Sequence, residues 1–232
     1  MDNRVKWLGH ATFEIVTKGG VRLLIDPWIT GNPSCPLSKE DVQGPDAILI
    51  THDHFDHVGE DIPYLVKDLN TKIVAQPEIV VKLKEQGVPE DNFINGMGMN
   101  IGGTVKIGEV EIIMVQAVHS SITGDPAGFI IITEDKKGIY HAGDTGVFYD
   151  MKLFAEMYSI DVAILPIGSV FVMDSFQAAQ SLQLLNPRKV VPMHYGTFPI
   201  LEQDAEEFIK LSRQKAPHVE VENIKPGEFT EC

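Results

Sequence analysis

The stretch AILITHDHFDH, residues 47–57, joins a short apolar run to a dense group of imidazole and carboxylate side chains. The apolar run predicts a buried strand, and the loop after a strand can bend so that several side chains point at one spot. Imidazole and carboxylate groups together suit zinc and its first-row neighbours. A solvated polar loop is the plain alternative, but so many such groups rarely crowd together after a buried strand without partners. The stretch therefore predicts four metal ligands: His52, His54, Asp56 and His57.

The motif His-x-His-x-Asp-His resembles the signature of the metallo-β-lactamase superfamily. Further motifs that carry the resemblance lie along nearly the whole chain: Gly9-His10-Ala11, Asp26-Pro27-Trp28, Gly31-Asn32-Pro33, the isolated His119, Gly143-Asp144-Thr145 and Pro192-Met193-His194-Tyr195-Gly196. Together they are similar to the branch that contains L-ascorbate-6-phosphate lactonase and many metal-dependent hydrolases.

The resemblance implies two divalent metal ions, and every ligand position of the family is filled here by the expected residue type. One ion would be held by His52, His54 and His119, and the other by Asp56, His57 and His194, with Asp144 bridging both. Taken singly, His119 also fits a structural histidine and Asp144 a turn cap. Zinc is the expected metal, and manganese and nickel accept the same donor set.

Other polar residues near these motifs are not among the seven predicted ligands. We interpret His10 as lining the site, where it would bind substrate or move a proton; a buried histidine bonded to the backbone fits equally well. Asp26 is expected to orient a ligand imidazole, as carboxylates behind metal ligands commonly do. Asp53 is expected to face solvent and Asp174 to cap a helix. The long loop 27–45 is favoured as a wall of the substrate pocket, with a sheet-edge cover as the alternative.

The length and composition of the chain indicate its number of domains, its location and its partners. The 232 residues suit a single domain, 1–232, and 44% of them are hydrophobic, as in ordinary globular proteins. No apolar run approaches a membrane span, no signal peptide is evident, and two cysteines favour a cytoplasmic location. The net charge of −14 disfavours nucleic acid as a partner. We expect a small-molecule substrate, no membrane partner and, from the resemblance, a homo-oligomer.

Apolar runs and turn residues predict strands first and helices later in each half of the chain. Strands are expected at 5–8, 13–16, 21–25, 47–50, 73–75, 110–118, 128–133, 138–141, 162–165, 190–192 and 219–221. Helices are expected at 62–69, 77–86, 151–158, 175–185 and 202–215. This order predicts an α/β (α+β) fold, a four-layer αββα sandwich, which the resemblance also implies. The early hairpins disfavour a doubly wound parallel sheet.

Two metal ions sharing a water would make hydroxide available near neutral pH and polarise a carbonyl or phosphoryl oxygen. The expected function is therefore hydrolysis of an ester, lactone or phosphodiester, with Asp56, Asp144 or His10 assisting proton movement. A ribonuclease or phosphodiesterase acting on nucleic acid is the main alternative, and the acidic chain opposes it. A redox enzyme is disfavoured because di-iron relatives typically have glutamate where this chain has His54. A non-catalytic binding protein would be expected to lack ligands.

Overall fold

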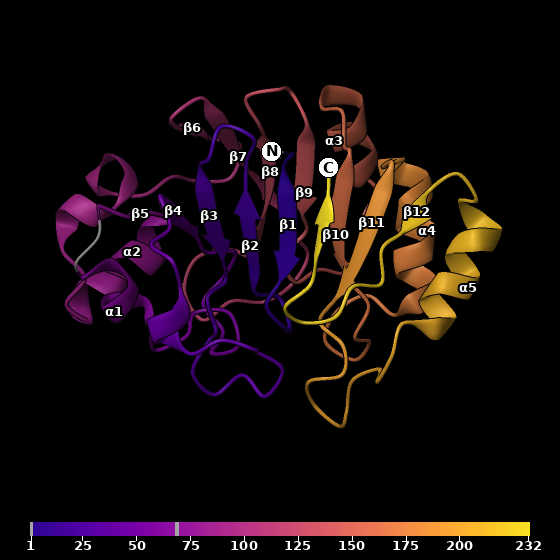
Figure 1. Cartoon of the computed structure of the whole chain (residues 1–232), viewed down its shortest axis with the longest axis horizontal. Coiled ribbons are helices and arrows are strands. Elements are labelled where there is room, and N and C mark those ends of the chain that lie inside the picture. The colour runs from indigo at the N-terminus through magenta and orange to yellow at the C-terminus, as the bar shows by residue number, and fades with distance from the viewer. Residues whose placement is uncertain (1, 68–69) are drawn as a thin grey trace.

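The computed structural model describes residues 2–67 and 70–232, and in it two β-sheets pack face to face between outer helices (Figure 1). The first sheet has the strand order β13-β1-β2-β3-β4-β5. Its strands are β1 Arg4–Trp7, β2 Phe13–Val16, β3 Arg22–Ile25, β4 Ala47–Leu49, β5 Lys72–Val74 and β13 Phe229–Glu231. The strands from β13 to β3 are antiparallel, whereas β3, β4 and β5 are parallel.

The second sheet has the strand order β12-β11-β10-β9-β8-β7-β6. Its strands are β6 Thr104–Ile107, β7 Val110–Gln116, β8 Ala127–Ile132, β9 Gly138–His141, β10 Val162–Pro166, β11 Lys189–Met193 and β12 Glu220–Val221. Strands β6 to β9 are antiparallel, and β9 to β12 are parallel.

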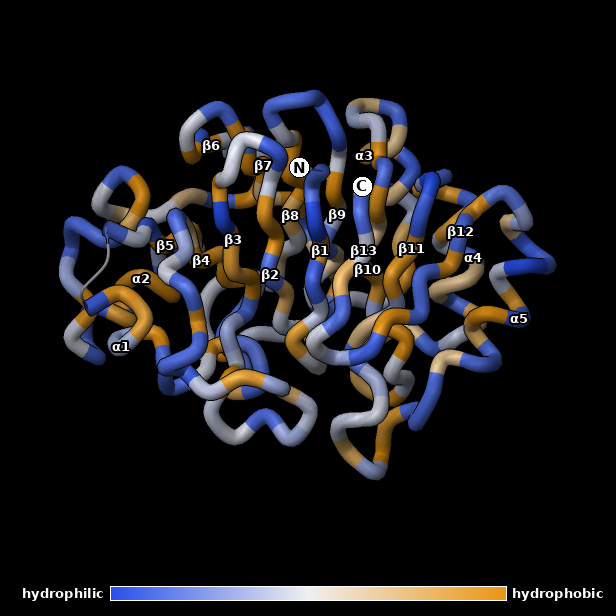
Figure 2. Tube along the Cα trace, in the orientation of Figure 1, coloured by the Kyte–Doolittle hydropathy of each residue, from blue (hydrophilic) through white to orange (hydrophobic). Residues whose placement is uncertain are grey.

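Three apolar layers hold these elements together. Alternate side chains of both sheets, such as Phe13, Ile15, Ile112 and Phe129, meet between the sheets. Helices α1 Ile62–Val66 and α2 Pro77–Glu85 cover the outer face of the first sheet, and α3 Met151–Met157, α4 Ser175–Leu185 and α5 Glu206–Lys215 cover that of the second. Figure 2 shows apolar residues along many of the strands and in α1 and α2, and hydrophilic residues on β1 and in many of the loops. The predicted αββα sandwich is confirmed.

Helix α2 shows how local sequence sets an element. Pro77 occupies its first turn, where a missing N–H costs nothing, and Gly87 ends it with a φ of 91°. Ile79, Val80 and Leu83 form one buried face against the sheet. Burying each such side chain contributes about 1.5–3 kcal/mol, which is more than helix propensity supplies.

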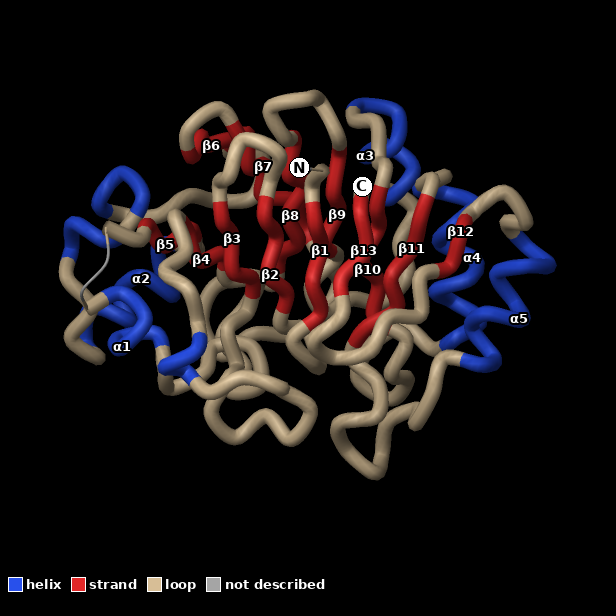
Figure 3. Tube along the Cα trace, viewed as in Figure 1, coloured by secondary structure: helices blue, strands red, loops and turns tan. Residues whose placement is uncertain are grey.

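Strand direction places the long loops at one edge of the sandwich. In the first sheet β1, β3 and β4 run the same way, and in the second β7, β9, β10 and β11 run the same way. Every predicted ligand follows one of these strands in the sequence. Figure 3 shows long loops gathered along the lower edge of both sheets.

Three elements illustrate where the structure differs from the sequence prediction. Helix α5 begins at Glu206 rather than at residue 202, because the Glu202 N–H donates to Gly168 O and its carbonyl accepts from the Gly196 N–H. Strand β13 was not predicted; it pairs with β1 at the edge of the first sheet. The helix expected at 62–69 ends at Val66, and residues 68–69 of that prediction lie outside the described residues.

No described helix has the length and apolarity needed to cross a membrane.

Candidate metal centre

The structure brings all seven predicted ligands to one place at the loop edge. Ligand atoms of each of three overlapping sets lie within 4.8 Å of one another. The sets are His52, His54 and His119; then His10, Asp56, His57 and His194; then His52, His57 and Asp144. The first two sets match the two predicted ligand groups, with His10 added to the second.

Asp144, from the loop after β9, lies between the two groups. Its Oδ2 is 3.0 Å from Nε2 of His194, 3.3 Å from Nε2 of His57 and 3.6 Å from Nε2 of His119. Burial by itself would raise the pKa of Asp144, but the neighbouring imidazoles of His194 and His57 hold it well below its usual value. The carboxylate is therefore charged, and it faces donors from both groups.

Some ligand atoms at this centre are not satisfied by hydrogen bonds to one another, which is expected of atoms that bind a metal ion. Oδ1 of Asp144 is buried and has no hydrogen-bond partner among the described residues, and the 3.3 Å contact of the buried Nε2 of His57 with Oδ2 of Asp144 lacks hydrogen-bond geometry. Such atoms are rare in folded proteins and call for a ligand to satisfy them. Burial lowers the pKa of His52 to about 3, so its imidazole is neutral and able to bind a cation at pH 7. The residues present therefore fit divalent metal ions.

Asp26 orients this machinery from behind, as the sequence predicted. Its Oδ2 lies 2.8 Å from Nδ1 of His57, and both of its oxygens accept hydrogen bonds from Thr51, from the backbone N–H and from the hydroxyl. The Thr51 hydroxyl is also 3.0 Å from Nδ1 of His52. One buried carboxylate thus fixes the ring orientation of His57 and the strand end that carries His52.

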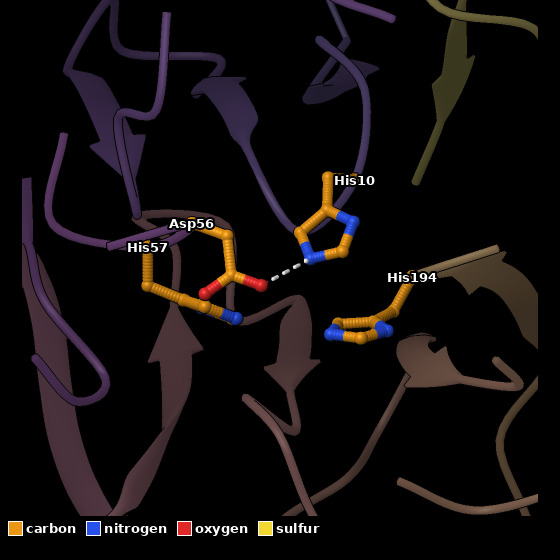
Figure 4. Close-up of side chains that lie close together, drawn as sticks. All are labelled: His10, Asp56, His57 and His194. Atoms are coloured by element: carbon orange, nitrogen blue, oxygen red, sulfur yellow. Dashed lines mark hydrogen bonds and ion pairs between the residues drawn. The ribbon is translucent and has the colours of Figure 1, made fainter. Parts of the chain in front are cut away.

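The ring nitrogens of His10 contact two side chains, and its backbone carbonyl accepts a hydrogen bond from the His194 N–H. Its Nε2 lies 3.1 Å from Oδ2 of Asp56 (Figure 4). Its Nδ1 lies 3.0 Å from Oγ1 of Thr197. Burial, together with His194, lowers the pKa of His10 to about 4, so the ring is neutral. It therefore donates from Nε2 to the Asp56 carboxylate and accepts from the Thr197 hydroxyl. The ring is fully buried, and its place behind Asp56 differs from the predicted position on the cavity wall.

Three site residues adopt left-handed backbone conformations that non-glycine residues rarely adopt. The φ angles are 54° at His10, 45° at Asp26 and 62° at His194, each just after a strand. A close approach of the backbone accompanies them, because a Cβ on Gly168 would lie 2.0 Å from the carbonyl oxygen of His194. Such conformations cost on the order of 1–3 kcal/mol each and cluster at functional sites.

Asp53 is buried, and the expectation that it faces solvent is wrong. Its carboxylate accepts hydrogen bonds from the backbone and hydroxyl groups of residues 121–123 and from Lys82 Nζ. This network ties the stretch that carries His52 and His54 to the loop that follows His119. Lys82 lies 29 residues away in sequence and the other partners 68 to 70, so no local pattern identifies them.

A cavity of about 750 Å³ opens over the ligands. Its polar floor includes His54, Asp56, His119, Asp144 and His194. Its walls are apolar, from Phe55, Phe171, Phe198, Pro199 and Ile200. Its volume lies within the range that ligand sites usually have.

The long loop 27–45, which was favoured as the pocket wall, does not line this cavity. Trp28 is buried beneath the wall, with its ring 5.8 Å from the rings of both Phe55 and Phe198. The loop therefore supports the aromatic wall from below. The apolar wall residues were not identified from sequence, because scattered apolar residues in loops carry no periodic signal.

Comparisons with known proteins identify the family of this chain. The family model of the beta-lactamase superfamily domain matches residues 21–195. The chain therefore belongs to the beta-lactamase superfamily, and its fold is that of the metallo-β-lactamases.

Particular relatives narrow the class. A UPF0173 metal-dependent hydrolase of Pyrobaculum islandicum is 49% identical over 97% of this chain and 98% of its own, and one of Nitratidesulfovibrio vulgaris is 44% identical over 98% and 95%. The structure of Igni18, a metallo hydrolase of Ignicoccus hospitalis, matches with a TM-score of 0.88 and 38% identity over 99% of this chain and 98% of that one. The predicted enzyme class, a metal-dependent hydrolase, is confirmed by these relatives.

Proposed function

We propose that this protein hydrolyses an ester, a lactone or a phosphodiester with two divalent metal ions. The observation that carries the proposal is the place of Asp144, whose Oδ2 lies within 3.6 Å of imidazoles from both ligand groups. A carboxylate in this position holds two cations close together, as two-metal hydrolases require. His52, His54 and His119 would hold one ion, and Asp56, His57 and His194 would hold the other.

When bound, the two ions would activate a water for attack and polarise the carbonyl or phosphoryl oxygen of the substrate. The chain's own residues prepare that chemistry. Asp26 keeps the ligand nitrogen of His57 aimed into the site through the 2.8 Å contact to its other nitrogen. The apolar walls limit the water around the reacting centre, which strengthens its electrostatic interactions.

His10 supports Asp56 in this proposal. Its Nε2–H binds one oxygen of the Asp56 carboxylate and leaves the other oxygen available as a metal ligand. The contact continues through Nδ1 to the Thr197 hydroxyl, so the hydrogen bonds point from Thr197 through His10 toward Asp56 and can deliver a proton to its carboxylate. General acid–base assistance of this kind contributes about 10²–10⁴-fold in rate.

The test is the variant Asp144→Asn. As the bridge, Asp144 matters to both ions, so we expect metal loss at both sites and near-complete loss of turnover. Elemental analysis and an ester hydrolysis assay on one preparation measure both effects. A folded variant that retains two ions and most of its activity would contradict the bridge and favour a turn-capping role. The exposed variant Asp91→Asn serves as the matched control.

A further inference from the structure

The walls of the cavity over the ligands differ sharply in character from its floor. Phe55 and Phe171 are 67% and 56% exposed, and Ile200 is 60% exposed. With Phe198 and Pro199 they form one apolar surface that is continuous with the ligands. Exposed apolar side chains gathered around a polar centre are typical of a binding site for an apolar group.

The charged residues that line the cavity indicate which substrates can bind there. Among the described residues that line it, none is a lysine or an arginine, while Asp56 and Asp144 contribute carboxylates. A phosphate group away from the metal ions would find no cationic partner there, whereas phosphate sites ordinarily provide arginine, lysine or backbone donors. The lining therefore favours a substrate whose non-reacting part is uncharged and apolar.

The backbone that presents Phe171 is strained. Ser169 and Val170, which precede it, have φ angles of 63° and 53°, and a β-branched valine rarely adopts this conformation. Hydrogen bonds hold the turn in place, since the Ser169 N–H donates to Met173 O and the Met173 N–H donates to Thr145 O. Strain that the surrounding structure maintains at a site mouth indicates a binding role for the residue it positions.

Ring contacts support the part of the wall formed by Phe55 and Phe198. Phe198 stacks on Trp28 with an interplanar angle of 17° and contacts the rings of Phe55 and His10. An aromatic surface that is already ordered loses little conformational entropy when an apolar group binds. The two walls thus form a prepared apolar slot that leads to the metal ligands.

From these observations we infer that the substrate is a carboxylic ester, open-chain or cyclic, whose acyl group is a hydrocarbon chain lying between Phe171 and the Phe55–Phe198 wall. The inference rests on the proposed function and narrows it. In the reaction, the acyl C–O bond breaks and a C–O bond to water oxygen forms. One proton of the water passes to the leaving alcohol and the other to solvent, giving a carboxylate.

The experiment measures kcat/KM of the metal-loaded protein on p-nitrophenyl acetate, butanoate and hexanoate, and on bis(p-nitrophenyl) phosphate. Burial of a methylene is worth about 0.8 kcal/mol, so in a partly open cavity kcat/KM is expected to rise about twofold to fourfold per methylene. Phe171→Ser is expected to bring the hexanoate-to-acetate ratio toward one. Phe229→Ser changes a similarly exposed phenylalanine on β13, outside this cavity, and is expected to preserve the ratio.

Binding gives a readout that does not depend on turnover. 2-Octanone, a neutral ketone that cannot be hydrolysed, is expected to change the tryptophan fluorescence of the protein and to bind at least tenfold more tightly than 2-butanone, which has four fewer methylenes. Ester hydrolysis without chain-length dependence, or a preference for the phosphodiester, would overturn the inference and leave the proposed function standing. Binding of 2-octanone without hydrolysis of any ester or phosphodiester would overturn the proposed function and support the apolar slot.

Discussion

The carboxylate of Asp53 offers a sharp test of how the ligand loops are held, because Asp53→Asn removes its charge and keeps its shape. Oδ1 accepts from the Ser121 hydroxyl and from the backbone of Ile122 and Thr123 at 2.7–3.1 Å. Oδ2 accepts from Lys82 Nζ and from the Thr123 hydroxyl, both at 2.9 Å. The Oδ1 of an asparagine can still accept the hydrogen bonds from residues 121–123. Its NH₂ group, in place of Oδ2, would face the donors Lys82 Nζ and the Thr123 hydroxyl and could not accept from them.

The size of the effect follows from these contacts. The Asp53 side chain is fully buried, whereas Lys82 is 31% exposed and can turn toward water once its partner is lost. A hydrogen bond to a charged group is worth about 1.5–3 kcal/mol, and breaking a buried ion pair costs about 3–5 kcal/mol. We therefore expect Asp53→Asn to lower the free energy of unfolding by about 2–4 kcal/mol. For a domain of this size, Tm would fall by roughly 5–15 °C.

The affinity for metal should also fall when the hydrogen bonds of Asp53 are lost. Because Asp53 ties the His52–His54 stretch to the loop after His119, the variant should bind metal about 10–100-fold more weakly, as is typical when a supporting residue is lost. Thermal unfolding monitored by circular dichroism and a calorimetric metal titration measure the two effects. Asp91→Asn removes the same charge at an exposed position and should change both by little. An Asp53→Asn protein with the stability and metal affinity of the wild type would refute this reasoning.

Three further substitutions test other parts of the site. Asp26→Asn should weaken metal binding about 10–100-fold by releasing His57, as measured by competition with a chelator, and unchanged affinity would remove its orienting role. Gly168→Ala places a Cβ 2.0 Å from the His194 carbonyl oxygen, so we expect a lower Tm and weaker metal binding; a variant that retains both would show that the approach can relax. His10→Ala should lower kcat about 10²–10⁴-fold with metal in excess, whereas a lowered Tm with unchanged turnover of the folded fraction would leave His10 only a structural role.

The core of the fold was predictable because its signals are local. Apolar runs such as 47–50 and 162–165 predict buried strands, and Pro77 and Gly87 mark the ends of α2. Strand β13 carries no such signal, since Phe229 and Glu231 are exposed and only Thr230 is buried. Its position depends on pairing with β1, more than two hundred residues away in sequence.

In the candidate site, too, some residues could be predicted from the sequence and others could not. The ligands were identified because their spacing resembles a family signature, and their convergence depends on that resemblance and on parallel strand ends. Asp53 was misjudged, because a charged residue between two histidines gives no local sign of the donors at residues 121–123. The walls at Phe171 and Ile200 were missed because exposure of an apolar side chain is set by tertiary packing rather than by sequence pattern.

A count of metal ions per folded chain tests the two-metal site most directly. The protein would be stripped with a chelator, reloaded separately with zinc, manganese and nickel, freed of unbound metal and measured by elemental analysis. With two ligand groups joined by Asp144, we predict two ions per chain for at least one of these metals. A folded protein that never binds more than one ion per chain, whichever metal is supplied, would contradict the account.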